Sequence, residues 1–391
     1  FCEHMLFLGT EKYPNSTDFS DFMAKSGGSD NAYTADELTV YFGEVSKGAT
    51  KEASDRYADF FRAPLFSQKF VKKEVHAIDS EHAKNVQNPS WRIMELLSSV
   101  ADERSPVSKF HTGNFDTLYD IPRKNGTSPV DALKVYFKRH YCPSKMQLVT
   151  FGPAPLAEQL RMANEDFGRI KPGSLACQGP LKKFAKPDPY PPGSLAKWLV
   201  AKGTEPEPSM WLHFPLPDLT ADFRSQPLSY IDHVLGYRGV DSFARVLADS
   251  LGLAHDSQTS YAMNSAGTSL FFICSLTSRG TQHLEIVLDV FFSYLATLRR
   301  AGVDKELYQT IADVAKLKWD WMEPAGAQDA ASSLAEQMTR LPPQKLLTGD
   351  SLIERLNTNL VSSLLERLTP ENMNVAYINP NASNTTLFKG Q

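Results

Sequence analysis

The chain has 391 residues, of which 42% are hydrophobic and 22% charged, so it is long enough for two domains with ordinary cores. With a net charge of −4, no basic stripe and no apolar run near the roughly 18 residues of a membrane helix, we expect no nucleic acid and no membrane as partner. The four cysteines lie far apart without a C-x-x-C pair, which predicts no disulfide framework, no cysteine zinc site and a reducing, cytoplasmic location.

The first half of the chain predicts helices and strands in mixed order. A helix is expected at 15–25, strands at 30–34 and 38–45, helices at 51–62, 68–85 and 131–140, and a strand at 146–151. This order favours an α+β fold, with a mostly antiparallel sheet covered by helices, over a doubly wound parallel fold. The proline- and glycine-rich stretch 171–193 predicts a linker between domains at 1–175 and 194–391.

The second half of the chain repeats the first at an offset of about 230 residues. Four segments recur in the same order: Glu3-His4-Met5-Leu6 as Asp232-His233-Val234-Leu235, Lys25-Ser26-Gly27-Gly28 as Asp249-Ser250-Leu251-Gly252, Val40-Tyr41-Phe42 as Leu270-Phe271-Phe272, and Pro143-Ser144-Lys145-Met146 as Pro370-Glu371-Asn372-Met373. Any single match could arise by chance between two α+β domains. The ordered set predicts two homologous domains.

Glu3 and His4 are neighbours on a segment that continues with Met5 and three further apolar residues, which predicts a helix close to the core. A carboxylate and an imidazole buried there cost free energy unless something pairs with them. The pair is also typical of a helix cap or of a core histidine with satisfied hydrogen bonds, so it does not define a site by itself.

The helix expected at 68–85 places two carboxylates, Glu74 and Glu81, on one face with Ile78. Acidic groups on an otherwise apolar stripe require a cation or hydrogen-bond donors, because an isolated buried charge is excluded or neutralised. A solvated charged face is the alternative interpretation, which the neighbouring Val71 and Ile78 disfavour.

A family resemblance connects these two helices. The segment from Phe1 to Thr10, FCEHMLFLGT, resembles the zinc helix of the insulysin family, pitrilysin-type zinc metallopeptidases with the inverted motif H-x-x-E-H. The segments 74–82, 27–34 and 108–114 also resemble that family. Its first motif histidine directly precedes the position of Phe1, so we expect an N-terminal fragment that starts one residue after that zinc ligand.

The resemblance implies a zinc-dependent endopeptidase that hydrolyses medium-sized peptides in an enclosed chamber, with Zn²⁺ as cofactor. His4 and Glu81 would be zinc ligands together with the upstream histidine, which leaves one position open for water. Glu3 would be the general base for that water, and zinc would polarise the scissile carbonyl. Glu74 would orient a ligand histidine.

The resemblance also implies that Asn31, Ala32 and Tyr33 form an edge strand to which the peptide substrate adds as a further strand. The other partners would be the C-terminal half of the same enzyme, which completes the chamber, and a second copy in a homodimer. In the second domain Ser229 and Asp232 stand where the first histidine and Glu3 would be, so that copy is expected to be inactive.

Two alternatives compete with this hypothesis. A non-catalytic member of the same family that binds peptides or serves as a structural subunit is distinguished by the residue before Phe1, where histidine supports the enzyme. A cysteine nucleophile, Cys2 with His4 as base, is disfavoured because side chains at i and i+2 of a helix point about 200° apart.

Overall fold

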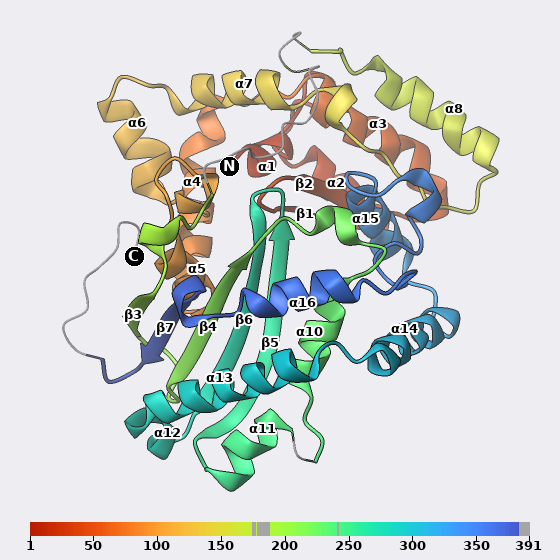
Figure 1. Ribbon diagram of the computed structural model, residues 1–391. Coiled ribbons are helices and arrows are strands. Elements are labelled where there is room, and N and C mark those ends of the chain that lie inside the picture. Colours follow the sequence, from red (N-terminus) through yellow and green to blue (C-terminus); the bar gives the residue numbers. More distant parts are fainter. Residues whose placement is uncertain (174–176, 178–187, 241, 383–391) are drawn as a thin grey trace. The chain divides into compact units, whose positions relative to one another are not determined.

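The structure is a computed structural model that describes residues 1–173, 177, 188–240 and 242–382 (Figure 1). Its internal contacts divide the chain into two compact units, each made of segments that are distant in the sequence. The first unit comprises Phe1–Ala83, Thr112–Lys182 and Glu323–Leu347, and the second comprises Lys84–His111, Lys183–Met322 and Thr348–Gln391. Most of the expected linker 171–193 lies outside the described residues, so the expected domain limits stay a prediction.

The first unit consists of helices around one β-hairpin. The hairpin strands are β1 (Ser29–Thr34) and β2 (Thr39–Glu44). The helices are α1 (Cys2–Leu6), α2 (Asp18–Lys25), α3 (Thr50–Arg62), α4 (Gln68–Asn85), α6 (Ile121–Lys124), α7 (Pro129–His140), α8 (Leu156–Asp166) and α15 (Ala327–Gln337). The last two residues of α4 belong to the second unit.

The core of the first unit joins the short helix α1 to the long helix α4. Met5 and Leu6 of α1 and Val71 and Val75 of α4 are completely buried in one apolar cluster. Burying such side chains contributes roughly 1.5–3 kcal/mol each. Because Val71 and Val75 are one turn apart, this packing fixes which side of α4 faces α1. Glu74 therefore lies at the margin of the core.

The hairpin presents its two faces to different helices of the first unit. Its strands pair antiparallel, with Thr34 opposite Thr39 next to the turn. On one face, Thr34 reaches Glu3 of α1. On the other face, the Tyr33 hydroxyl donates to Glu336 of α15 at 2.9 Å. A segment from the second half of the chain therefore packs against the first repeat's hairpin.

The second unit is built on a five-stranded sheet in the order β3-β7-β4-β6-β5. Its strands are β3 (Lys197–Lys202), β4 (Ser209–Leu216), β5 (Ala254–Asn264), β6 (Gly267–Leu276) and β7 (Asn374–Asn379). Only β3 and β7 pair in parallel among these described strands. The helices are α5 (Pro89–Ser98), α10 (Pro227–Gly236), α11 (Phe243–Arg245), α12 (Ser278–Gln282), α13 (Leu284–Ala301), α14 (Lys305–Asp320) and α16 (Thr358–Glu366).

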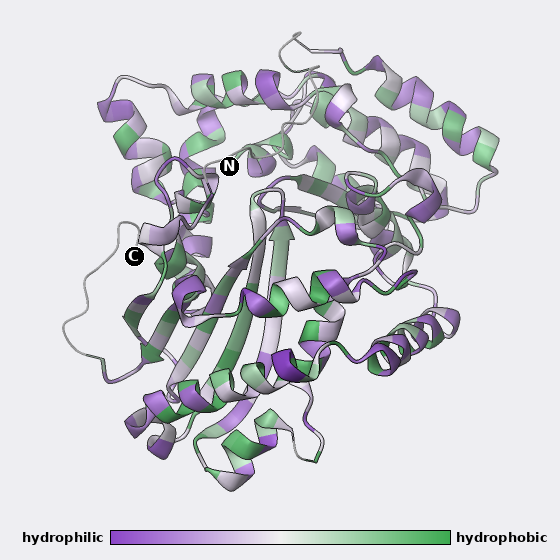
Figure 2. Ribbon diagram, in the orientation of Figure 1, coloured by the Kyte–Doolittle hydropathy of each residue, from purple (hydrophilic) through white to green (hydrophobic). Residues whose placement is uncertain are grey.

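Both faces of this sheet carry apolar side chains. On one face, Leu212 and Phe272 pack with α10, α13 and α16, and Figure 1 shows α13 and α16 crossing the strands. On the other face, Ala376 and Ile378 of β7 pack against Ile93 and its neighbours on α5. The inner strand β6 is accordingly largely hydrophobic, whereas the edge strand β5 is more polar (Figure 2). No helix in the described part of the chain is long and apolar enough to span a bilayer.

The repeat predicted from the sequence is visible in the order of elements. The series α1, β1, β2 of the first unit corresponds to α10, β5, β6 of the second. Both helical segments that precede β1 and β5 end near a glycine with the same left-handed backbone, Gly27 at φ 60° and Gly252 at φ 61°. The expected α+β fold with antiparallel sheets is confirmed, and the helix expected at 68–85 has those bounds.

The strand expected at 146–151 is absent, although all six residues are described. Met146 has an extended backbone, with φ −103° and ψ 146°. No described strand pairs with this segment, and a strand requires a partner for its backbone hydrogen bonds. The local pattern was strand-like, but the prediction was wrong because pairing is not a local property.

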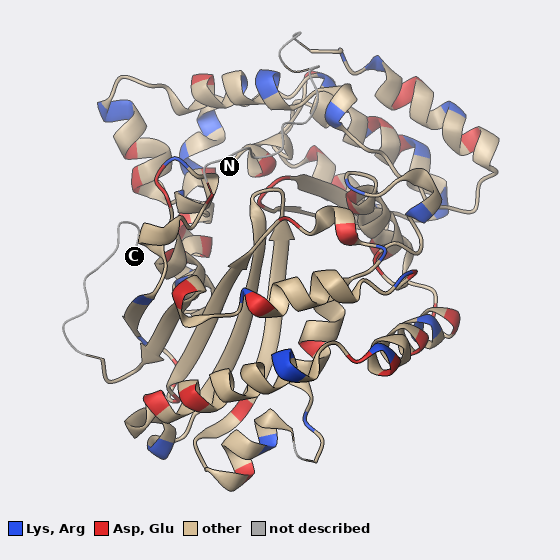
Figure 3. Ribbon diagram, viewed as in Figure 1, with Lys and Arg blue, Asp and Glu red and all other residues tan. Residues whose placement is uncertain are grey.

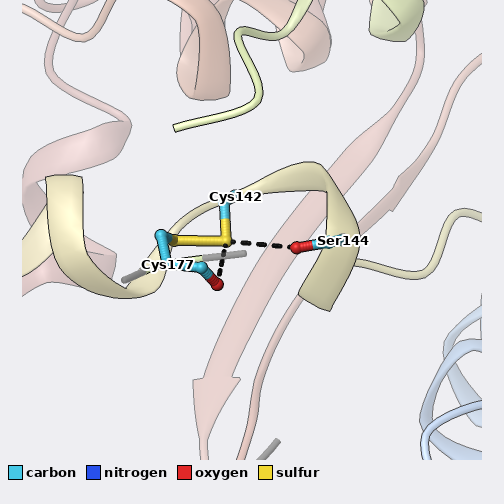
Figure 4. The surroundings of a disulfide bond; sticks show 3 residues. All are labelled: Cys142, Ser144 and Cys177. Carbon is cyan, nitrogen blue, oxygen red and sulfur yellow. Dashed lines mark hydrogen bonds between the residues drawn. A yellow bond between two sulfur atoms is a disulfide. The ribbon is translucent and has the colours of Figure 1, made fainter. Parts of the chain in front are cut away.

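The expectation of no disulfide was also wrong, because Cys142 and Cys177 form one (Figure 4). The two cysteines are 35 residues apart, and both are completely buried. Cys142 lies two residues after the end of α7, and the hydroxyl of Ser144 lies 3.5 Å from its sulfur. Chain separation alone did not exclude the pair, because the fold brings the two positions together. Cys2 and Cys274 are free thiols.

Candidate active site

Helix α1 carries Glu3 and His4 at the margin of the first unit's core. The helix runs from Cys2 to Leu6, and its buried residues Cys2, Met5 and Leu6 attach it to the interior. His4 remains 23% exposed, so its ring is anchored by the helix and is still accessible. This short helix therefore presents an imidazole and a carboxylate from adjacent positions.

His4 lies between the two carboxylates that the sequence singled out on α4. Its Nδ1 is 3.5 Å from Oε2 of Glu74, and its Nε2 is 3.5 Å from Oε2 of Glu81. The two acids are seven residues apart, which places them on one face of α4, two turns from each other. Glu74 is mostly buried at 13% exposure, whereas Glu81 is 56% exposed.

These distances can be compared with zinc coordination. Zinc binds histidine nitrogen and carboxylate oxygen at about 2.0–2.2 Å, so two ligands in a tetrahedral site lie about 3.4 Å apart. The separation of His4 Nε2 and Glu81 Oε2, 3.5 Å, fits one zinc ion bound by both. The ring thus turns Nδ1 towards Glu74 and Nε2 towards Glu81.

His4 and Glu81 could supply two of the three protein ligands that a catalytic zinc site needs. No group of three or more His, Cys, Asp and Glu side chains with metal-binding geometry occurs in the described ranges. The exposure of Glu81 also shows why a solvated charged face was a reasonable alternative for this side of α4.

Glu3 contacts the hairpin through its carboxylate. Its Oε2 accepts a hydrogen bond of 2.5 Å from the hydroxyl of Thr34, the last residue of β1. One carboxylate oxygen is thus held by the strand, which leaves Oε1 to exchange a proton. This arrangement is compatible with a base that stands beside a metal without binding it.

The candidate substrate strand is an edge strand in the described part of the first unit. β1 pairs only with β2 there. The amide of Ala32 donates to Oδ1 of Asn31 at 2.8 Å, which shows that it is available to an acceptor outside the ladder. Burial and the bond to Glu336 raise the pKa of Tyr33 to about 12, so its hydroxyl stays protonated.

The environment of Cys2 argues against a cysteine nucleophile. The thiol is buried, and desolvation raises its pKa to about 11. A thiol protonated at neutral pH is a poor nucleophile. Cys2 is instead part of the apolar cluster that holds α1 in place.

Sequence reasoning missed Thr34 and Glu336 as neighbours of the candidate residues. Thr34 lies within the segment 27–34 that carries the family resemblance, so its position next to the substrate strand was a usable signal. Glu336 had no such signal, because it is 303 residues from Tyr33 and only the fold brings the two together.

In the second unit, α10 and α14 take the places of α1 and α4, but they carry different side chains at the corresponding positions. Ser229 and Asp232 lie on α10, where the hydroxyl of Ser229 donates to Gln226 at 3.4 Å. On α14, Asp313 accepts a hydrogen bond of 2.8 Å from Gln309. Acidic and basic residues alternate along α14 in Figure 3, as on a solvated helix.

Comparison with known proteins decides the family. Consecutive family profiles match most of the chain: "Insulinase (Peptidase family M16)" at 1–109, "Peptidase M16 inactive domain" at 129–313 and "Middle or third domain of peptidase_M16" at 319–389. The chain belongs to the M16 peptidase family. The resemblance drawn from the sequence is thereby confirmed at the family level.

Several M16 relatives are similar over nearly the whole chain. The A-factor-processing enzyme of Saccharomyces cerevisiae is 30% identical over 97% of this chain and 36% of its own length, and insulin-degrading enzyme of Homo sapiens is 30% identical over 97% and 37%. The solved structure of pitrilysin has a TM-score of 0.90 at 27% identity, covering 100% of this chain and 41% of pitrilysin. The chain thus spans about two fifths of the length of these M16 proteins.

Proposed function

We propose that this M16 chain is the N-terminal part of a zinc-dependent endopeptidase that hydrolyses medium-sized peptides. The observation that carries the proposal is the position of His4 between Glu74 and Glu81, at 3.5 Å from each. Support for zinc comes from the nitrogen and oxygen donors at its ligand spacing. The words "zinc protease" also occur in the name of a Schizosaccharomyces pombe relative, 32% identical over 95% of this chain and 38% of its own length.

In this proposal His4 and Glu81 hold the metal together with the histidine that precedes Phe1 in the family motif. Zinc bound there supplies Lewis-acid polarisation of the scissile carbonyl and lowers the pKa of water. Glu74 accepts the Nδ1 proton of His4 and keeps the ring oriented. Glu3 takes the proton of the attacking water and transfers it to the leaving amine.

The substrate binds in an extended form along β1, where Asn31, Ala32 and Tyr33 offer an edge. Backbone hydrogen bonds to an edge strand give affinity with little dependence on side chains, which suits an enzyme with many peptide substrates. The C-terminal half of the same enzyme completes an enclosed chamber, and two copies form a homodimer. The cytoplasmic location expected from the sequence stays part of the proposal.

The alternative function is a non-catalytic member of the family that binds peptides. A test of zinc-dependent cleavage by the full-length protein distinguishes this alternative from the peptidase. We expect hydrolysis of an unstructured peptide of medium size, loss of hydrolysis with a chelator and recovery with added zinc. Peptide binding without cleavage at any zinc concentration would support the alternative and contradict the peptidase.

A further inference from the structure

We propose that Thr34 is a positioning residue that fixes the carboxylate of Glu3 for proton transfer, an inference that rests on the proposed peptidase function. Thr34 ends β1, and its hydroxyl donates to Glu3 Oε2 at 2.5 Å. Glutamate has three side-chain torsions, so an unheld carboxylate on the exposed side of α1 would sample several directions. The hydrogen bond from the Thr34 hydroxyl to the carboxylate of Glu3 removes that freedom.

The direction of the neighbouring hydrogen bonds supports this role. A threonine hydroxyl has one hydrogen to donate and two lone pairs to accept. Thr34 Oγ1 also lies 3.2 Å from Oγ1 of Thr39, its cross-strand partner. Since the hydrogen of Thr34 is directed to Glu3, Thr39 has to donate in this second bond. Thr34 is therefore itself held in one rotamer.

A partly buried tyrosine pair extends the same chain of hydroxyls towards the core. Tyr141 lies beside Thr39, and its hydroxyl is 2.8 Å from that of Tyr41. Burial raises the pKa of both tyrosines, so both hydroxyls stay neutral and able to donate. Tyr41 belongs to β2 and Tyr141 follows α7, so elements of the core determine where Thr39 and Thr34 point.

The internal repeat offers a comparison within the same chain. In the second unit the Thr259 hydroxyl of β5 donates to Asp232 of α10, the residue at the place of Glu3. We expect the bond there to fasten the helix to the strand, since Ser229 stands in this unit at the place of the family motif's first histidine. If the bond from Thr34 to Glu3 also had a purely structural purpose, its removal should change kcat no more than removal of the bond from Thr259 to Asp232.

The test uses the full-length protein with Thr34→Val, which keeps the branched shape and removes the hydroxyl. We expect kcat to fall roughly 10-fold to 100-fold, the value of one hydrogen bond to a charged group, while KM and zinc affinity stay within about twofold. Thr34→Ser restores the hydroxyl and should recover most of kcat. Thr259→Val is the matched control and should leave kcat unchanged.

Three results would overturn the assignment of Thr34: an unchanged kcat in Thr34→Val, an equal loss of kcat in Thr259→Val, or loss of zinc from Thr34→Val. A folding defect is recognised by its melting temperature, and Thr34→Ser then decides, because a positioning role requires the serine variant to outperform valine in kcat at equal stability. Failure of the function itself is distinguishable. If the wild-type protein shows no zinc-dependent cleavage, or if Glu3→Gln cleaves as fast as wild type, the peptidase proposal fails before Thr34 is tested.

Discussion

His4 has two ring nitrogens, and each faces a different carboxylate of α4. Glu74 is the more buried of the two, so its contact with Nδ1 is shielded from water and directs Nε2 towards Glu81. Glu81 is the more exposed acid and faces Nε2, where an ion can arrive from solvent. In the proposed function, this difference in burial suits Glu74 for orienting the ring and Glu81 for binding the metal.

A substitution at Glu74 should therefore weaken metal binding without removing a ligand. We expect Glu74→Gln to lower zinc affinity roughly 10-fold to 100-fold in the full-length protein, since an amide orients the ring less firmly than a carboxylate. Competition with a chromophoric chelator measures the dissociation constant. Glu306→Gln on α14 is the control, because Glu306 and Asp313 repeat the seven-residue spacing of Glu74 and Glu81 in the second half of the chain. Equal affinities for Glu74→Gln and wild type would contradict the orienting role.

His213 on β4 gives the second unit a dependence on pH. It is completely buried, its Nε2 is 3.0 Å from the Ser269 hydroxyl, and desolvation lowers its pKa to about 3. The unfolded chain binds a proton near pH 6.5 and the folded chain does not, so the stability present above pH 6.5 is lost as pH falls from there towards 3.

The expected slope is about 1.4 kcal/mol of unfolding free energy per pH unit below pH 6.5 from this histidine. Urea unfolding of wild type and His213→Leu at pH 7.5, 6.0 and 5.0 measures it. The leucine variant should lose less stability on acidification, whatever its stability at pH 7.5. Parallel pH profiles for the two proteins would show that His213 titrates normally.

At the scale of elements, the two repeats end their corresponding helical segments in the same way. Gly27 and Gly252 both have φ near 60°, and a Cβ on either would meet no atom within 4 Å. Each Gly→Ala change should cost about 1 kcal/mol, all of it from backbone strain. Gly48→Ala, at a glycine with equal space and no positive φ, should be nearly neutral. Thermal unfolding compares the three variants, and a neutral Gly27→Ala would contradict the shared left-handed ending.

The β1 edge makes a prediction about substrate binding. Because the Ala32 amide donates to the Asn31 side chain, proline at position 32 removes a donor that the β1–β2 ladder does not use. Ala32→Pro should weaken peptide binding at least 10-fold and leave zinc affinity unchanged. Peptide affinity is measured on a zinc-loaded Glu3→Gln background. Unchanged affinity in a folded variant would exclude strand addition at this edge.

The elements differ in how far their sequence determines them. The bounds of α4 follow from the spacing of Val71, Val75 and Ile78, because a helix forms its hydrogen bonds within itself. The segment 146–151 has the pattern of a strand, but no described strand lies beside it to pair. The disulfide and the packing of α15 on the hairpin depend on residues far apart in the sequence, for which local patterns give no signal.

At the scale of the whole molecule, the candidate site was partly predictable. Glu74 and Glu81 could be selected from helix periodicity, but only the family resemblance joined them to Glu3 and His4, 70 residues or more upstream in one chain. The bond from Thr34 needed the folded hairpin. Since the chain spans about two fifths of its M16 relatives, the chamber and the remaining groups are proposals for the full-length protein.

The most direct measurement of the central claim compares zinc content and peptide turnover of Glu3→Gln and Glu81→Gln in the full-length protein. The two acids have different roles in this account: Glu3 transfers a proton and Glu81 binds zinc. One variant should therefore lose turnover alone, and the other should lose the metal. Glu3→Gln is predicted to retain zinc while turnover falls by roughly 10²–10⁴, and Glu81→Gln is predicted to lose zinc and activity together. A Glu3→Gln protein without zinc beside a Glu81→Gln protein that still holds it would contradict the assignment of base and ligand.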